Sequence, residues 1–249
     1  MSLPHFLLTY SRLAQKIFRS TAIQLGFLSV NQLRVLIYHD IPSRHEEEFE
    51  AQLVFLKKNW KFISPSEFEK MISGEKPIIG SNLLLTFDDG FYSNYTVAKK
   101  FLNPMEIKAI FFIVSNFINI KELTESHKFI SKNISPSIDI QDIPSDCKNM
   151  NWKELDDLLS QGHTIGCHTK SHARLSQIYS DEDLQDEILS CSIEIREKLN
   201  IEVKHFAYPF GNVNSFSKKA LEISKQVFPF IHSGVRGENI KSNKTALIF

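Results

Sequence analysis

Two adjacent carboxylates, Asp88 and Asp89, end an apolar run and precede a glycine in the segment from Leu83 to Gly90. The apolar run predicts a buried strand, and Asp and Gly are common turn residues, so both acids are expected where the strand ends. Successive side chains on a strand point to opposite faces. One carboxylate can therefore bind a metal ion while the other stays free as a base. A plain strand-to-turn junction is the alternative interpretation.

A second group that could do chemistry is the pair His168 and His172. Histidines four residues apart lie on one face of a helical turn, so their rings can converge on one ion. A solvated helical turn is the alternative, since nine histidines in 249 residues produce chance pairs. The pair follows a predicted strand, and in a parallel barrel it would share a rim with the two acids. Asp89, His168 and His172 are then three ligands of the type that an open catalytic zinc site uses.

The elements that must position these side chains alternate along the chain from residue 33. The helix after residue 64 has a clear start, because Ser64 can cap it, Pro65 takes its first position and Glu67 is expected to close a capping box. Strands that are apolar on both faces and alternate with helices are typical of a parallel sheet covered by helices, so the predicted class is α/β. Strands are predicted at 33–38, 62–63, 83–87, 109–114, 163–167, 205–208 and 229–233, and further helices at 46–60, 93–103, 152–161, 182–199 and 215–225.

Three stretches stand outside this alternation. Residues 119–150 are polar and uneven and are predicted to be a long loop or insertion that could rim the active site. Residues 1–30 mix apolar and basic side chains without the roughly 20 apolar residues of a membrane span. We predict that they form an amphipathic helical segment, either packed on the domain formed by residues 31–249 or in contact with a membrane surface. The apolar ending 246–249 predicts a chain that stops inside a strand, as a C-terminally truncated domain would.

Composition narrows the partners and the compartment. Lys and Arg together number 29, as do Asp and Glu, so no basic field indicates a nucleic-acid partner. Three cysteines without a CxxC pair fit a reduced compartment better than a disulfide framework. No clear signal peptide is present. The predicted localisation is therefore cytoplasmic or membrane-associated.

Three motifs, in this order and spacing, resemble the polysaccharide deacetylases that share the NodB homology domain (carbohydrate esterase family 4). The resemblance runs from about residue 33 to 240 and implies a distorted (β/α) barrel. It also implies a metal-dependent hydrolase that removes N-acetyl groups from the amino sugars of an N-acetylated glycan of the cell envelope. The motifs are Thr86-Phe87-Asp88-Asp89-Gly90, His168-Thr169-Lys170-Ser171-His172 and Phe206-Ala207-Tyr208-Pro209-Phe210-Gly211.

The resemblance assigns a role to each chemical group of the first two motifs. It implies that Asp88 is the general base and that Asp89, His168 and His172 bind a divalent metal ion. Zinc is the first expectation, with cobalt and nickel as alternatives, because ligand identity alone does not select among first-row metals.

The third motif and Gly90 are expected to contact the substrate. The resemblance implies that Tyr208 and Pro209 lie at the sugar site and that the backbone N–H of Tyr208 holds the oxyanion of the reaction. Many family members carry an arginine at the start of this motif that orients the base. Here that region reads His205-Phe206-Ala207-Tyr208, so an arginine is missing.

The general acid is expected near the N-terminal end of the chain and not near its C-terminal end. Many members carry a late Leu-x-His motif, and none closes this chain, but Leu36-Ile37-Tyr38-His39 looks like that motif moved to the N-terminal end. This order is similar to the branch that acts on poly-N-acetylglucosamine. The first and last strands of a closed barrel are neighbours, so His39 is expected in the site as the acid. A histidine that merely caps a strand end is the alternative, and His232 is a second candidate.

Two other classes were weighed on the same residues. A phosphatase of the haloacid type would need Asp-x-Asp and would leave the histidine pair unexplained. A catalytically inactive carbohydrate-binding relative would be expected if a metal ligand were missing, but all three are present in the sequence. The natural glycan is left open, with poly-N-acetylglucosamine, peptidoglycan, capsule or O-antigen intermediates and lipid-linked sugars all compatible with these residues.

Overall fold

A curled parallel sheet holds the chain together. The fold is taken from a computed structural model, which describes residues 31–235, 237, 239 and 247–248. The predicted N-terminal segment, residues 1–30, lies outside the described residues. The eight-stranded sheet has the order β1-β3-β4-β5-β6-β7-β8, with β2 paired to β3 off this path, and every strand pairing is parallel. The strands are β1 Gln32–Tyr38, β2 Lys61–Phe62, β3 Ser81–Phe87, β4 Ala109–Ile113, β5 Thr164–Cys167, β6 His205–Ala207, β7 Phe230–His232 and β8 Leu247–Ile248.

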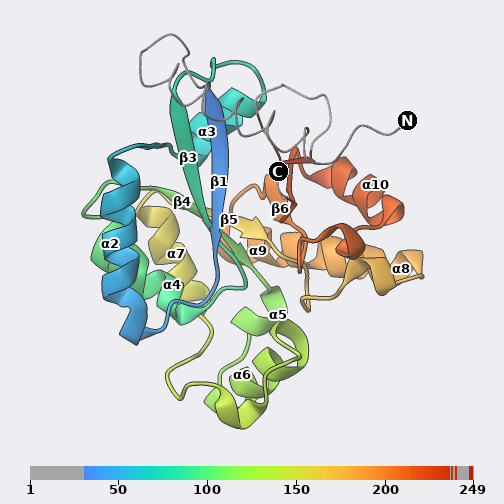
Figure 1. The fold of residues 1–249 in the computed structure, drawn as a ribbon. Helices are drawn as coiled ribbons and strands as arrows, with labels where there is room; N and C mark the ends of the chain where they lie inside the picture. Colours follow the sequence, from blue (N-terminus) through green and yellow to red (C-terminus); the bar gives the residue numbers. More distant parts are fainter. Residues whose placement is uncertain (1–30, 236, 238, 240–246, 249) are drawn as a thin grey trace, which may run out of the picture.

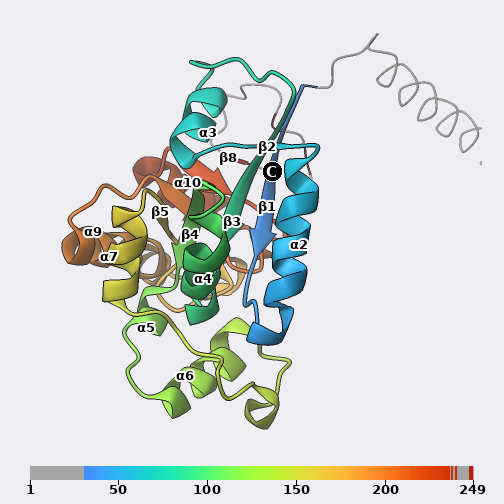
Figure 2. The same cartoon turned by 90° about the vertical axis from the view of Figure 1, so that its left-hand side faces the viewer.

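Helices surround the outside of this sheet, so the molecule is a distorted α/β barrel, as predicted (Figures 1 and 2). Among the residues that the structure describes, no helix combines the length and apolar character of a membrane span. The helices are α2 Glu46–Lys57, α3 Pro65–Ile72, α4 Tyr92–Val97, α5 Ser115–Ile118, α6 Leu123–Phe129, α7 Trp152–Ser160, α8 Asp181–Gln185, α9 Cys191–Leu199 and α10 Lys218–Val227. The predicted helix at 182–199 includes α8 and α9, joined by a π-helical turn at Asp186–Ser190.

Alternate residues of the strands pack on opposite sides of the sheet. Leu85 and Phe87 belong to the cluster beneath the surrounding helices, whereas Leu84 lies in a second cluster with Phe112 and Phe68 of α3. These side chains are essentially inaccessible to solvent. Burial on both faces is the reason that the strands read as continuous apolar runs.

The barrel is not closed by hydrogen bonds between its first and last strands. β1 pairs with β3, and no pairing joins β1 to β8 among the described residues. The two strands still lie near each other, because Leu33 of β1 and Ile248 of β8 belong to one hydrophobic cluster. The β1–β3 register sets Tyr38 opposite Phe87, so His39 and Asp88 follow these strands at the same level. Pairing with β3 brings His39 to the rim.

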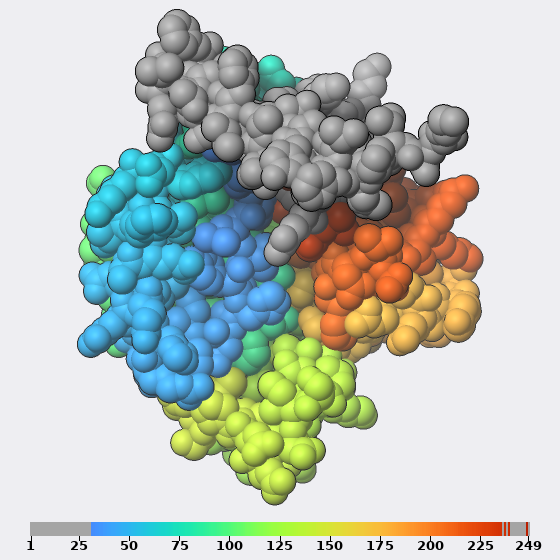
Figure 3. All heavy atoms as spheres, in the orientation of Figure 1, coloured from blue at the N-terminus to red at the C-terminus, as the bar shows by residue number. Residues whose placement is uncertain are grey.

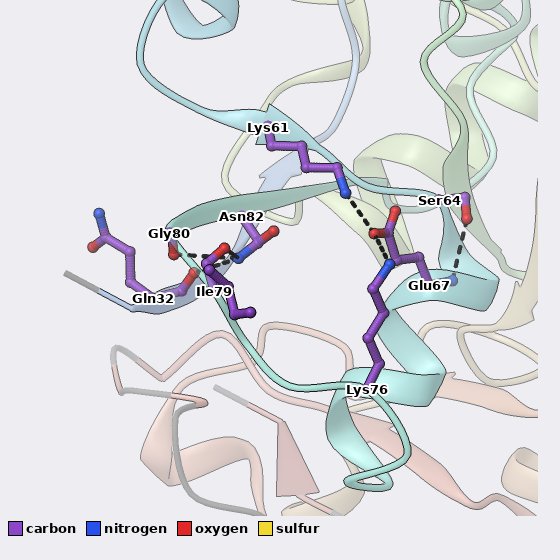
Figure 4. A network of polar contacts seen from close by, with 8 residues as sticks. All are labelled: Gln32, Lys61, Ser64, Glu67, Lys76, Ile79, Gly80 and Asn82. Carbon is purple, nitrogen blue, oxygen red and sulfur yellow. Dashed lines mark hydrogen bonds and ion pairs between the residues drawn. The ribbon is translucent and has the colours of Figure 1, made fainter. Parts of the chain in front are cut away.

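The start of α3 follows the prediction only in part. Ser64 Oγ accepts a hydrogen bond from the N–H of Glu67 at 3.1 Å, and Pro65 is the first helical residue. The Glu67 carboxylate does not close a capping box. It lies between the amino groups of Lys61 and Lys76 and binds both, because these lysines extend toward it from either side (Figure 4).

Residues 119–150, termed here the insertion module, combine short helices with loops. The module contains α6, a π-helical turn at Ile130–Ile134 and a 3₁₀ turn at Ile140–Asp142. It has a small hydrophobic cluster of its own, in which Ile130 and Ile134 pack with Phe117 and Cys147. The module lies at the end of the body where the strands finish (Figure 1) and projects from it in the space-filling view (Figure 3). Of the two predicted alternatives, a long loop or an insertion, the structure shows an insertion at the rim, and its short helices were not predicted.

Candidate metal centre and active site

The three predicted ligands converge at the carboxyl ends of the strands. Asp89 follows β3, and His168 and His172 follow β5. Oδ1 of Asp89 is 3.6 Å from Nε2 of His168 and 3.3 Å from Nε2 of His172. One ligand atom of each residue lies within 4.8 Å of the others, and all three side chains are buried. The arrangement is that of a three-ligand site for one metal ion.

The two histidines converge through an irregular turn and not through the helical turn expected from their spacing. Thr169 and His172 have φ angles of 68° and 62°, in the left-handed region that non-glycine residues seldom adopt. The N–H of His172 donates to Oγ1 of Thr169 at 3.0 Å, which closes the turn. Left-handed residues of this kind persist where the surroundings hold them, and they concentrate at functional sites.

Hydrogen bonds to backbone carbonyls fix which nitrogen of each ring faces Asp89. Nδ1 of His168 lies 2.8 Å from the carbonyl oxygen of Ala207, and Nδ1 of His172 lies 2.8 Å from that of Asn133. A carbonyl can only accept, so Nδ1 carries the proton in both rings. The unprotonated Nε2 atoms then face Asp89, as metal-ligating histidines do.

The electrostatics of the cluster fit a bound cation. Burial, together with the nearby Asp40 carboxylate, raises the pKa of Asp89 to about 7. Burial lowers the pKa of His172 to about 4 and holds the pKa of His168 well below its usual range. Neither carboxylate oxygen of Asp89 has a hydrogen-bond partner among the described residues. Buried acceptors without partners are rare and costly, and a divalent ion at this point would satisfy them.

Asp88 lines a separate, interior pocket beside this cluster. The pocket has a volume of about 90 Å³, and its lining includes His39, Tyr208 and His232. Asp88 is buried, and its Oδ1 has no partner among the described residues. Burial, reinforced by the charge of Asp89, raises the pKa of Asp88 well above its ordinary value. The two adjacent acids thus face different surroundings, as expected at the end of a strand. Asp89 faces the two histidines, and Asp88 lines the pocket.

His39 lies at the mouth of this pocket, one residue beyond β1. Its carbonyl accepts a hydrogen bond from the amide of Asn94 at 2.8 Å, which fixes the backbone at the strand end. The side chain has a solvent-exposed edge, and desolvation by the surrounding protein lowers its pKa. His232, the second candidate acid, is buried on β7 and bonded to His205 Nδ1 through Nε2 at 3.0 Å.

Of the three residues predicted to contact the substrate, only Tyr208 lines this pocket. Tyr208 lines the pocket with Asp88, but its N–H donates to the carbonyl of His232 at 3.2 Å. The expectation that this N–H is free to hold an oxyanion is therefore wrong, because β6 and β7 use it in their pairing. Pro209 and Gly90 are both buried and do not line this pocket. A Cβ on Gly90 would lie 2.8 Å from Cδ1 of Ile118, and its φ of 97° suits only glycine.

Two neighbours of the site were missed from the sequence. Asp40 accepts hydrogen bonds from Oγ of Ser93 at 2.7 Å and from Sγ of Cys147 at 3.7 Å. Asn133 of the insertion module contacts the His172 turn. Asp40 had a signal, since it follows His39 directly at a predicted strand end, whereas Asn133 had none.

A larger cavity lies beside the site, between the insertion module and the body. Its volume is about 1020 Å³, and it is lined by residues that include Asp40, Tyr92 and Trp152. None of the three candidate metal ligands lines it. The three candidate ligands do not line the smaller pocket either, but Asp88 and His39 do, so the acid–base chemistry is expected there.

Comparison with known proteins agrees with this geometry. The polysaccharide deacetylase family model matches residues 76–227, a stretch that holds both acids, both histidines and Tyr208. The protein "Putative polysaccharide deacetylase YxkH" of Bacillus subtilis is 25% identical over 198 residues, which cover 77% of this chain and 61% of that protein. The chain thus spans less than two thirds of this relative's length.

Two solved structures share the fold. IcaB from Ammonifex degensii superposes with a TM-score of 0.68 at 21% identity, covering 88% of this chain and 91% of that one. The deacetylase PplD of Streptococcus pyogenes, solved in complex with acetate, gives a TM-score of 0.65 at 20% identity with the same coverage. The family model matches more than half of this chain. The chain therefore belongs to the polysaccharide deacetylase family, which carries the NodB homology domain.

Proposed function

We propose that this chain is a metal-dependent hydrolase that removes N-acetyl groups from amino sugars in an N-acetylated glycan. The observation that carries the proposal is the buried Asp89 carboxylate, which has no hydrogen-bond partner in the described part of the chain. It lies 3.3–3.6 Å from the unprotonated nitrogens of two histidines. Such a set is costly to bury without a cation. Zinc is the expected ion, with cobalt and nickel as alternatives.

A divalent ion held by Asp89, His168 and His172 would supply Lewis-acid polarisation of the amide carbonyl and would acidify water at the site. The chain's own part in the reaction begins with Asp88. Its unpartnered Oδ1 is placed to take a proton from the attacking water, whose oxygen forms the new bond to the carbonyl carbon. The raised pKa of Asp88 makes it a stronger base than an exposed carboxylate.

His39 is the proposed general acid. It shares the lining of the pocket with Asp88, so a reacting group in that pocket can meet both side chains. As the C–N bond breaks, His39 donates a proton to the leaving nitrogen. The products are acetate and a free amino group on the sugar. Tyr208 forms part of the pocket wall, where it would contact the sugar or its acetyl group.

The proposed substrate class rests on the family, which implies a polysaccharide. Poly-N-acetylglucosamine is the first candidate, because the early position of His39 in the chain resembles the order in that branch. An inactive carbohydrate-binding relative is the alternative, and the presence of all three ligands and both acid–base candidates disfavours it.

The test is acetate release from N-acetylglucosamine oligomers by the purified chain. The protein is treated with a chelator and then supplied with zinc, cobalt or nickel. Activity that is lost and then restored supports the proposal. Stoichiometric metal binding without acetate release would contradict the substrate class, and absence of metal binding would contradict the ligand assignment.

A further inference from the structure

The turn that carries His172 is held by donors from outside its own strand. Three successive carbonyls of this turn accept hydrogen bonds. Those of Thr169 and Lys170 accept from the backbone N–H groups of Ser115 at 3.4 Å and Asn116 at 2.9 Å. The carbonyl of Ser171 accepts from the side-chain amide of Asn133 at 3.0 Å. A side chain of the insertion module therefore provides the last of these three bonds.

Asn133 also contacts the ring of His172 itself. Its carbonyl oxygen, in the last turn of the helical segment that ends at Ile134, lies 2.8 Å from Nδ1 of His172. Carbonyls at a helix C-terminus have no N–H partner within the helix and are free to accept such a bond. One residue thus bonds both the backbone next to His172 and its imidazole.

The turn needs this restraint because its backbone is unfavourable. Thr169 and His172 are left-handed, a conformation whose cost the surroundings must offset. On the barrel side, the Glu187 carboxylate accepts from the N–H of Ser171 at 2.9 Å. Asn133 contacts the same residue from the module side. Both Asn133 and Glu187 lie in π-helical turns, a feature frequent at functional sites.

We infer that Asn133 is a positioning residue for the metal ligand His172, so that the insertion module is a working part of the metal centre and not only a rim. This inference rests on the metal site of the proposed function and deepens it. The backbone carbonyl of Asn133 keeps the proton of His172 on Nδ1, with Nε2 toward Asp89, 3.3 Å away, and its side-chain amide holds the neighbouring Ser171 carbonyl in place. Partners of this kind change metal affinity by about 10- to 100-fold when they are lost.

The experiment measures the zinc dissociation constant of the metal-free full chain by competition with a chromogenic chelator. Asn133→Ala removes the amide that bonds the Ser171 carbonyl but keeps the backbone carbonyl that bonds Nδ1 of His172. We expect it to weaken zinc binding by about 10-fold, because the turn that carries the ligand loses one of its restraints. Asn133→Asp keeps the shape of the side chain but cannot donate to the Ser171 carbonyl, so it should weaken zinc similarly. The visible absorption spectrum of the cobalt-loaded protein should change in both variants, because it reports ligand geometry.

The matched control is Asn149→Ala in the same module. Asn149 is half-buried like Asn133 and donates its amide to the carbonyls of Ile120 and Met150, both at 2.9 Å, without contacting the His172 turn. It should lower the melting temperature of the metal-free protein and leave the zinc dissociation constant and the cobalt spectrum unchanged.

Three results would overturn the inference. They are wild-type zinc affinity in both Asn133 variants, an equal loss of affinity in Asn149→Ala, and no zinc binding by the wild-type chain. A failure of the deacetylase proposal looks different, because zinc affinity would still respond to Asn133 while no acetate is released.

Discussion

The Nδ1 atom of His168 lies 2.8 Å from the carbonyl oxygen of Ala207, so a strand that carries none of the predicted metal ligands orients one of them. Ala207 is the last residue of β6, within the third motif. The bond sets the ring of His168 with Nε2 toward Asp89. The third motif therefore contributes a backbone carbonyl that orients a side chain of the predicted metal site.

Asp88→Asn should abolish turnover while zinc still binds. The substitution removes the proposed base, whose contribution is about 10²- to 10⁴-fold in rate, but none of the three ligands. Acetate release and zinc affinity are measured on the same preparation. His168→Ala is the contrasting variant and should lose both properties. Turnover in Asp88→Asn close to that of the wild type would show that another group takes the proton.

His39→Ala should lower kcat by about 10²- to 10³-fold without a change in zinc affinity, because the ring donates a proton and binds no metal. His45→Ala is a suitable control. His45 lies a few residues further along the same connection, is exposed, and contacts Glu48 and not the pocket. Near-normal turnover in His39→Ala would remove His39 from the mechanism and make His232 the next residue to test.

Gly90→Ala should destabilise the fold by about 2–5 kcal/mol, the sum of a left-handed alanine and an overpacked contact. The added Cβ would meet Cδ1 of Ile118 at 2.8 Å. Gly74→Ala is the control, since Gly74 also has a positive φ, of 82°, but has no atom within 4 Å of the added Cβ. It should cost only about 1–2 kcal/mol. Equal losses in urea denaturation would mean that the close approach to Ile118 is unimportant.

His163 should make stability depend on pH below neutrality. The ring is buried, its Nδ1 accepts from the N–H of Ala109 at 3.2 Å, and burial lowers its pKa to about 4. Since the folded pKa lies below the unfolded value of about 6.5, this contribution is complete above that pH and is lost as pH falls toward 4. Between pH 7.5 and 4.5 the loss is about 2.5 kcal/mol.

The measurement for His163 is urea denaturation of the wild type and His163→Gln across this pH range. Glutamine does not titrate, so the difference in unfolding free energy between the two proteins should shift against the wild type as the pH is lowered. A difference that stays constant with pH would indicate that His163 is not buried as a neutral ring in solution.

The strands could be predicted well from the sequence because burial on both faces of the sheet produces continuous apolar runs. The runs that contain Leu84 and Phe112 are almost entirely apolar, so their strands could be placed within a residue or two. The meeting of Asp89 with His168 and His172 also followed from strand ends alone. Whether these residues act as ligands and catalysts stays a prediction until metal and turnover are measured.

The features that were missed depend on contacts between distant segments. The turn that carries the left-handed His172 is bonded by Asn133, by α5 and by Glu187, which a local pattern does not reveal. The N–H of Tyr208 is occupied because His232 lies opposite it in the next strand. The short helices of the insertion module were not predicted, because its few apolar side chains pack in a small cluster and its other positions are polar.

β1 joins the sheet through its pairing with β3, and the family match, residues 76–227, begins after it. The proposed base and ligands thus lie within the stretch that the family model matches, while the proposed proton donor follows a strand outside it. Replacement of this single strand would exchange the proton donor and leave the metal ligands in place. In this fold, leaving-group protonation and metal chemistry are therefore properties that evolution or design can vary independently.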